Sequence, residues 1–294
     1  MLPSPSVEQQ WVPLSARDGA DTGYGALHDG VPPWLRASLW AWVDARIYVA
    51  SPTGSSLSAQ LLQEIERACR LEFDWQQDQY SARSSLRSLL ETDPEKFLDA
   101  LDFLVYRADA YGQGAYALQA LDGILEQGGS EWRVATRDGE SRLEQRVEDS
   151  VGIAMDEVIA RTGRAGQYLA LAWKELYGRN PNPSGAYRES VKAVEAAAQP
   201  VLLPQNDRAT LGQMIAAVRD APDRWTVNLR PSQGNPVSDL LGMMRLLWRA
   251  EYDRHGTATG EVPLQVGANE AEAAVHLAAT LVHWFHSGTV TTSG

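Results

Sequence analysis

Apolar residues recur at intervals of three and four over most of this 294-residue chain, which is the spacing of an amphipathic helix. In the N-terminal half the pattern predicts five helices, over residues 34–49, 58–73, 86–90, 94–105 and 115–125. Asp93 and Pro94 mark the start of the fourth helix, because a capping residue is followed there by proline at the first helical position. Gly128 and Gly129 are expected to end the fifth helix.

The helical period breaks at residues 131–144, where short extended runs flank Arg137, Asp138 and Gly139 and predict a small β-hairpin. Further helices follow over residues 149–161, 164–177, 186–198, 209–219, 237–252 and 269–286, with a short extended stretch at 225–229. The predicted fold is therefore mostly α, with two helical units and one hairpin. We place an acidic N-terminal domain at residues 1–150, a helical C-terminal domain at 151–288 and a frayed tail at 289–294.

The composition is that of a globular protein. Hydrophobic residues make up 44% of the chain and charged residues 22%, which is ample apolar material for packed cores. No apolar run approaches the roughly 18 to 20 residues of a membrane-spanning helix, and residues 1–10 lack the pattern of a secretory signal. The single cysteine, Cys69, suits a reducing compartment and is expected to be small core filler. We therefore expect a cytoplasmic protein without a membrane partner.

Charge is distributed unevenly between the two halves. Residues 1–150 carry 13 Lys and Arg against 24 Asp and Glu, a net charge of −11, whereas residues 151–294 carry 13 against 14. Because phosphate contacts need local positive charge, the acidic half is a poor candidate for nucleic-acid binding. The nearly neutral C-terminal half leaves room for a small basic site.

The common catalytic and binding motifs are absent from the sequence. It contains no GxxxxGK[ST] phosphate loop, no GxGxxG after a strand, no HExxH, no CxxC, no GxSxG and no DNA-binding motif. With one cysteine, a thiolate metal cluster cannot be built within one chain. We therefore expect no cofactor, and we look for candidate chemistry among the histidines.

Three polar residues of the last predicted helix, Glu272, His276 and His283, share the face opposite its apolar stripe. Glu272 and His276 are one turn apart and suit a metal ion, but His283 lies roughly 10 Å further along the axis. That separation is too long for a single ion. We interpret this face as polar, solvated or in contact with a second subunit, and regard a metal-dependent hydrolase as the weaker alternative.

A cluster of cations lies at the end of the predicted helix over residues 237–252. Arg245 and Arg249 are one turn apart beside its apolar stripe, and Arg254 and His255 follow where the helix ends. Arginine holds a phosphate with its planar guanidinium, and histidine moves protons near neutral pH. Together they suit RNA cleavage without metal, in which a base removes the 2′-hydroxyl proton and arginine stabilises the charged phosphorane. The alternative is structural, because cations complement the dipole at a helix C-terminus.

Several short motifs resemble those of AbiJ-like abortive-infection proteins. In the C-terminal half they are residues 181–196, residues 209–215, the Tyr-Asp-Arg-His-Gly run at 252–256 and the alanine-rich last helix. In the N-terminal half, residues 33–42 resemble the leucine-arginine and leucine-tryptophan helix of that family's first domain. These motifs are spread over most of the chain, and the C-terminal match is the better one.

The resemblance implies a bacterial anti-phage effector whose C-terminal domain is a HEPN-like helical bundle, a fold that often forms homodimers. Active HEPN ribonucleases carry arginine and histidine four to six residues apart, and five residues separate Arg249 from His255 here. In the AbiJ-like pattern the adjacent pair, Arg254 and His255, is the recurrent feature, so either arginine suits the phosphate. The implied partners are RNA, a second copy of the chain and an unknown phage trigger. A noncatalytic sensing or interaction module is the alternative.

Glu195 is a supporting candidate on or near the apolar stripe of the predicted helix over residues 186–198. A buried carboxylate needs a partner, and an arginine of the segment 254–256 would serve. Glu195 would then orient that arginine rather than act as a base. A partly exposed glutamate with a packed stem is an equally good interpretation.

Overall fold

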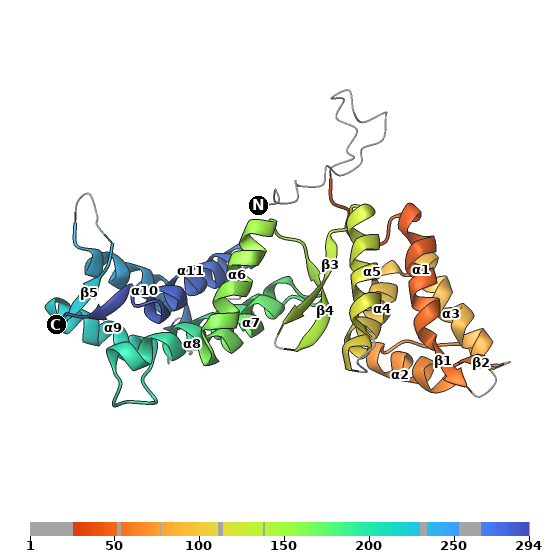
Figure 1. Cartoon of the computed structure of the whole chain (residues 1–294), viewed down its shortest axis with the longest axis horizontal. Coiled ribbons are helices and arrows are strands. Elements are labelled where there is room, and N and C mark those ends of the chain that lie inside the picture. The colour runs from red at the N-terminus through yellow and green to blue at the C-terminus, as the bar shows by residue number, and fades with distance from the viewer. Residues whose placement is uncertain are drawn as a thin grey trace, which may run out of the picture. The chain divides into compact units, whose positions relative to one another are not determined.

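The computed structural model describes residues 26–51, 54–76, 78–110, 114–137, 139–229, 234–252 and 266–293. These residues form eleven α-helices, and their strands pair into three two-stranded sheets, so the fold is mostly α as predicted (Figure 1). The chain divides into two compact units, Met1–Val134 and Ala135–Gly294. This boundary lies earlier than the predicted one at residue 150, because Arg137 and Glu144 of the hairpin bond to side chains of the C-terminal helices.

The N-terminal unit is a group of helices with one small hairpin. Its elements are α1 (Pro33–Ile47), β1 (Tyr48–Ser51), β2 (Gly54–Leu57), α2 (Ala59–Cys69), α3 (Gln79–Thr92), α4 (Pro94–Ala110) and α5 (Gly114–Gln127). Their apolar stripes supply a core of fully buried side chains, among them Val43, Leu62, Phe97, Leu101 and Leu121. The spacing of these residues is the signal that predicts the helices.

Two elements of this unit differ from the prediction. The apolar pattern predicts the first helix to reach residue 49, but α1 ends at Ile47, and Tyr48 pairs with Leu57 in an antiparallel hairpin. The aromatic and β-branched residues there favour a strand while also continuing the helical spacing. The third helix is longer than the predicted 86–90, because Asp78 caps it by accepting a hydrogen bond from the Tyr80 N–H.

Cys69 at the end of α2 is half-buried rather than fully enclosed. Burial, together with the nearby charges of Asp99 and Asp102, raises the pKa of its thiol to about 12. The thiol is therefore protonated at neutral pH and a poor nucleophile. The prediction of a small core filler is met only in part, because Cys69 is not fully buried.

The C-terminal unit is a larger helical bundle. The hairpin strand β3 (Trp132–Arg137) crosses the unit boundary and pairs with β4 (Glu140–Gln145). The elements that follow are α6 (Asp149–Arg161), α7 (Arg164–Tyr177), α8 (Pro183–Leu202), α9 (Leu211–Asp220), β5 (Trp225–Val227), α10 (Pro236–Tyr252), α11 (Ala268–His286) and β6 (Val290–Thr292). Most of these helices lie within a few residues of their predicted bounds.

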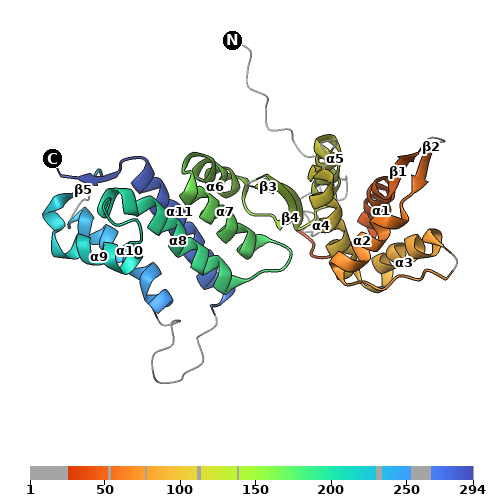
Figure 2. The ribbon, with the colours of Figure 1, turned by 90° about the horizontal axis from the view of Figure 1, so that it is seen from below.

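Helix α8 is the central element of this unit. It packs along α7 and α11, and Figure 2 shows the three helices side by side. Small buried residues on α8, including Ala186, Ser190, Ala193 and Ala198, let the neighbouring helices approach closely. Larger side chains from α7, α10 and α11 fill the remaining volume of one continuous core.

The prediction of a frayed tail at residues 289–294 was wrong. Val290–Thr292 form the strand β6, which pairs antiparallel with β5, and Val227 lies opposite Val290. Val290 is buried and belongs to the hydrophobic core. The partner strand lies more than 60 residues earlier in the chain, so local sequence gives no sign of the pairing. None of the described helices is long and apolar enough to span a membrane.

Candidate functional site

Helix α10 carries the predicted cation cluster, and two contacts fix its C-terminal half. Val237, Leu240, Met244 and Leu247 are buried in the core. The hydroxyl of Tyr187, on α8, donates one bifurcated hydrogen bond, which the backbone oxygens of Leu246 at 3.2 Å and Leu247 at 2.9 Å share. Leu246 and Leu247 precede the last four carbonyls of α10, so the contact with Tyr187 adds to their bonds within the helix. Tyr187 therefore attaches this end of α10 to α8.

A glycine on α9 provides the second contact. A Cβ atom placed on Gly212 would lie 2.6 Å from the ring of Trp248, so the indole sits directly against the backbone of α9. Trp248 is half-buried and follows directly after the two carbonyls that Tyr187 binds. Helix α10 is thus held to α8 and α9 immediately before the predicted site begins.

The predicted site residues fall on both sides of the limit of the described structure. Arg245 is an exposed residue of α10. Arg249 lies in the last turn and a half of α10, but its side chain is outside the described part of the chain. Arg254 and His255 lie outside the described residues. The structure thus shows the helix that leads to the predicted site. That Arg249, Arg254 and His255 lie close together stays a prediction.

Glu195 has a partner among the described residues, whereas the arginine proposed for it lies outside them. Its Oε1 accepts a hydrogen bond of 2.7 Å from the backbone N–H of Leu211, the first residue of α9. Thr210 and Gln213 form a reciprocal capping box at the same helix end. Glu195 therefore helps to satisfy the free N–H groups at the start of α9. The Thr-x-x-Gln spacing is the sequence signal for this helix start.

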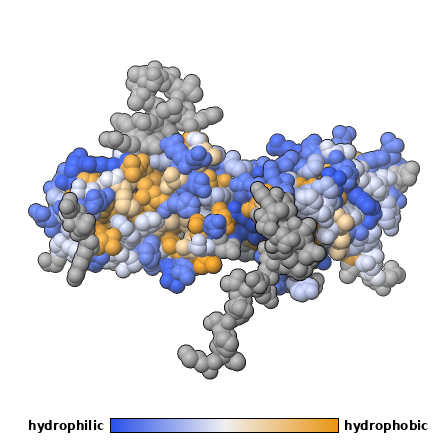
Figure 3. Space-filling model, turned by 90° about the horizontal axis from the view of Figure 1, so that it is seen from above, coloured by the Kyte–Doolittle hydropathy of each residue, from blue (hydrophilic) through white to orange (hydrophobic). Residues whose placement is uncertain are grey.

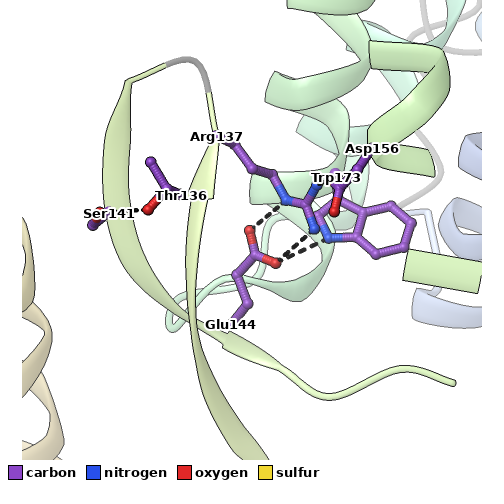
Figure 4. Close-up of polar contacts among 6 residues, drawn as sticks. All are labelled: Thr136, Arg137, Ser141, Glu144, Asp156 and Trp173. Atoms are coloured by element: carbon purple, nitrogen blue, oxygen red, sulfur yellow. Dashed lines mark hydrogen bonds and ion pairs between the residues drawn. The ribbon is translucent and has the colours of Figure 1, made fainter. Parts of the chain in front are cut away.

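A buried ion cluster, which the sequence patterns do not predict, joins the hairpin to α6 and α7 (Figure 4). The Arg137 guanidinium donates from Nε to Glu144 Oε1 at 2.7 Å and from a terminal nitrogen to Glu144 Oε2 at 3.1 Å. A second terminal nitrogen donates to Asp156. The indole N–H of Trp173 donates to Glu144 Oε2 at 3.1 Å, and Arg137 also lies over the Trp173 ring, 4.9 Å from its centroid.

Arg137 and Glu144 are almost completely enclosed, with side chains only 7% and 4% exposed. Burial disfavours the charge of Arg137, but its hydrogen bonds with Glu144 and the charges of Glu144 and Asp156 outweigh burial and raise its pKa. Both carboxylate oxygens of Glu144 accept hydrogen bonds from Arg137. The cluster is therefore a satisfied structural unit and presents no open arginine to a ligand.

A second polar group extends this cluster towards α11. The Tyr177 hydroxyl donates to Glu272 Oε1 at 2.9 Å and is hydrogen-bonded to His276 Nε2 at 3.2 Å. The Trp173 ring contacts both Tyr177, at 4.5 Å between centroids, and His276, at 5.9 Å. Burial and the hydrogen bond and charge of Glu272 raise the pKa of Tyr177 well above its ordinary value. Tyr177 is therefore a neutral hydrogen-bond donor.

His276 also lines a groove of about 410 Å³ between α6 and α11. The groove wall is largely apolar, with Val151, Ala154 and Met155 from α6, and His283 lies at the α11 side. Figure 3 shows several apolar side chains reaching the surface of the C-terminal unit. Within the described part of the chain, no three His, Cys, Asp or Glu residues are close enough together to hold a metal ion. The predicted polar face thus consists of exposed Glu272 and His283 with a half-buried His276 between them.

Comparison of the sequence with protein-family models and with curated proteins, and of the fold with solved structures, found no match.

Proposed function

We propose that this chain is a bacterial anti-phage effector of the abortive-infection type, whose C-terminal unit cleaves RNA without a metal ion. In this proposal His255 transfers the proton, and Arg249 or Arg254 holds the phosphate. The support comes from the resemblance of the sequence motifs to AbiJ-like proteins and from the arginine–histidine spacing at the end of α10. The helical C-terminal unit is compatible with a HEPN-like bundle.

The observation that carries the proposal is how the end of α10 is held. Tyr187 binds the carbonyls of Leu246 and Leu247, and Trp248 packs against Gly212. Arg249 is the next residue along the chain. A site built on a rigid element keeps its charged groups in position, which is what stabilisation of a transition state requires.

The proposed reaction needs only acid–base and electrostatic catalysis. His255 removes the proton of the 2′-hydroxyl, and that oxygen attacks the adjacent phosphorus. The bond from phosphorus to the 5′ oxygen of the next nucleotide breaks, and this leaving oxygen takes up a proton. The products are a 2′,3′-cyclic phosphate and a 5′-hydroxyl end. Arginine stabilises the extra negative charge on the phosphorane oxygens.

The first test is phage plating on cells that express the wild-type protein, Arg249→Ala, Arg254→Ala or His255→Ala at equal soluble levels. We expect His255→Ala to lose protection, and whichever arginine holds the phosphate to lose it as well. His286→Ala is the matched control, because it removes an exposed imidazole of α11 that does not line the α6–α11 groove. It should protect like the wild type.

Purified protein provides the second test, with labelled RNA in the presence of a metal chelator. Cleavage by the wild type should leave cyclic phosphate ends, and His255→Ala should be slower by about 10²-fold or more. A folded His255→Ala protein that still cleaves RNA at the wild-type rate would show that the proposed chemistry is wrong.

The α6–α11 groove favours a noncatalytic interaction module as the second candidate. Its apolar lining and the exposed Ile153 on α6 are features of surfaces that bind other proteins. This candidate predicts that His255→Ala keeps protection. Ala154→Glu, which places a charge in the groove, should abolish protection without unfolding the chain, because Ala154 is exposed.

A further inference from the structure

The N-terminal unit contains a cavity of about 500 Å³ that no part of the proposed function uses. It lies where the end of α1, the β1–β2 hairpin, the start of α2, the end of α4 and the start of α5 meet. Leu61 and Leu104 provide apolar wall, and Arg46, Glu64 and Arg107 provide charge. Its volume is within the range of about 300–1,000 Å³ that is typical of small-molecule sites.

The charges around the cavity leave an excess of positive charge. Arg107 forms an ion pair with Glu64 at 2.8 Å, and Gln60 also donates to Glu64 at 3.1 Å. That wall is therefore close to neutral. Arg46 adds a further cation, so the described lining has a formal charge of +1. This is the reverse of the surrounding sequence, because residues 1–150 carry 13 basic against 24 acidic residues.

Arg46 differs from Arg107 because the described part of the chain gives it no anionic partner. Among the described residues no carboxylate lies within ion-pair distance of Arg46, whereas Arg107 is paired with Glu64. Its guanidinium lies over the ring of Trp42, 5.8 Å from the centroid. An anion in the cavity would give the guanidinium of Arg46 a partner of opposite charge.

The start of α5 provides an independent second feature. Gly114 is the first residue of this 14-residue helix and lines the cavity. The first turn of α5 contains no acidic residue. The N-terminus of a helix carries partial positive charge and attracts anions. Arg46 and the α5 terminus therefore present positive charge to the same cavity.

We infer that this cavity binds a small organic anion, with a carboxylate or phosphate group at Arg46 and an apolar body against Leu61 and Leu104. The guanidinium and the helix terminus would hold the anionic oxygens. The apolar wall would bury the rest of the ligand. An anion without an apolar body should therefore bind weakly. This inference is independent of the proposed RNA chemistry, because it concerns the other unit.

The test is titration calorimetry on the full-length protein with benzoate, phenyl phosphate, inorganic phosphate and the neutral benzyl alcohol. We expect saturable binding of one equivalent of benzoate or phenyl phosphate, whichever group the site prefers, and at least tenfold weaker binding of benzyl alcohol. Inorganic phosphate should also bind at least tenfold more weakly, because it lacks an apolar body. Arg46→Gln should weaken binding of the organic anion at least tenfold.

Arg87→Gln is the matched control. Arg87 also lies over a tryptophan, 5.8 Å from the Trp40 ring centroid in the same unit, but it does not line this cavity. It should bind the probes like the wild type. Ala108→Leu keeps the charge of Arg46 and fills the cavity, so it should also abolish binding even if Arg46→Gln proves unstable.

Three results would overturn the inference. The first is that neither organic anion binds the wild-type protein. The second is that folded Arg46→Gln or Ala108→Leu binds as tightly as the wild type. The third is that inorganic phosphate or benzyl alcohol binds as tightly as the organic anions.

Discussion

At the scale of single residues, the buried pair of Arg137 and Glu144 has the largest expected effect on stability. Each side chain is withdrawn from water, and each depends on the other for its charge to be tolerated. Trp173 contributes to the same arrangement by donating to Glu144 and by lying under the guanidinium. Loss of Arg137 would leave Glu144 buried without its cation, and loss of Glu144 would leave the buried Arg137 with only the exposed Asp156 as an anionic partner.

We therefore predict that Glu144→Gln lowers the free energy of unfolding by about 3–5 kcal/mol. Glu140→Gln is the control on the same strand, since Glu140 forms an exposed pair with Lys174 at 3.1 Å. Its loss should cost no more than about 1 kcal/mol. Urea unfolding monitored by circular dichroism gives both values. Equal effects of the two substitutions would mean that the buried pair has no special role.

The raised pKa of Cys69 leads to a prediction about its reactivity. Because its thiol pKa is about 12, the reactive thiolate is scarce at pH 8. Native protein should react with a thiol-specific reagent far more slowly than protein unfolded in urea. The chain has one cysteine, so the signal reports this thiol alone. Reaction at the same rate in both states would contradict the assigned burial.

At the scale of elements, helix packing depends on where side chains are absent as well as where they are present. Gly212 allows α9 to lie directly on Trp248 of α10. A Cβ atom placed on Gly242 of α10 would meet no other atom within 4 Å, so the same substitution meets open space there. The two glycines are a matched pair in neighbouring helices.

Gly212→Ala should lower the free energy of unfolding by about 1–3 kcal/mol, because the new methyl group must displace the indole. Gly242→Ala should raise it by about 0.5–1 kcal/mol, because alanine loses less backbone entropy in a helix. Denaturant midpoints of the two variants would then move in opposite directions. A shift of both in the same direction would contradict the close contact of α9 with Trp248.

The last strand gives a further prediction at this scale. Val290→Ala should destabilise the protein by about 1.5–3 kcal/mol, because Val290 is buried between β6 and the core. Thr292→Ala on the same strand removes an exposed side chain and should change stability little. Thermal unfolding of the two variants checks the difference. If Val290→Ala is as stable as the wild type, this segment does not contribute to the core.

Elements differ in how far sequence alone could predict them. The bounds of α6 and α7 follow directly from apolar spacing, since each helix buries one stripe. The β1–β2 hairpin could not be predicted because Tyr48 and Val49 fit both periods, and β6 could not because its partner is distant in sequence. The same limit applies to the site: Arg137 and Glu144 lie on one predicted hairpin, but nothing local connects them with Asp156 or Trp173.

At the scale of the whole molecule, acidic charge sets the response to pH. The formal net charge is −12 and the isoelectric point is near 4.9. Hydrogen bonds from basic partners lower the pKa values of Asp93, Glu140 and Asp220, whereas burial raises that of Glu131. Three of these four carboxyl groups thus have a lowered pKa. At those three sites the folded protein binds a proton less tightly than the unfolded protein does.

Stability should therefore fall as the pH is lowered below the ordinary carboxyl values of 3.8 and 4.5. Above the ordinary pKa values the three ion pairs stabilise the folded state fully. This stabilisation is lost as the pH falls and each carboxylate is protonated in the folded state. The melting temperature at pH 3 should be lower than at pH 7 at constant ionic strength. Arg219→Gln, which removes the partner of Asp220, should show a slightly smaller loss. A melting temperature that is unchanged or higher at pH 3 would contradict the lowered pKa values of these carboxyl groups.

The enclosed cluster of Arg137, Glu144 and Trp173 also constrains how this protein can evolve. Loss of one charge leaves the other buried without its partner, so selection should remove single substitutions at these positions. Replacement of both residues by apolar ones should cost little stability. Positions 137 and 144 should therefore change together among related sequences. A lineage with an apolar residue at 137 should also have lost the acid at 144, so the two positions would show covariation rather than independent drift.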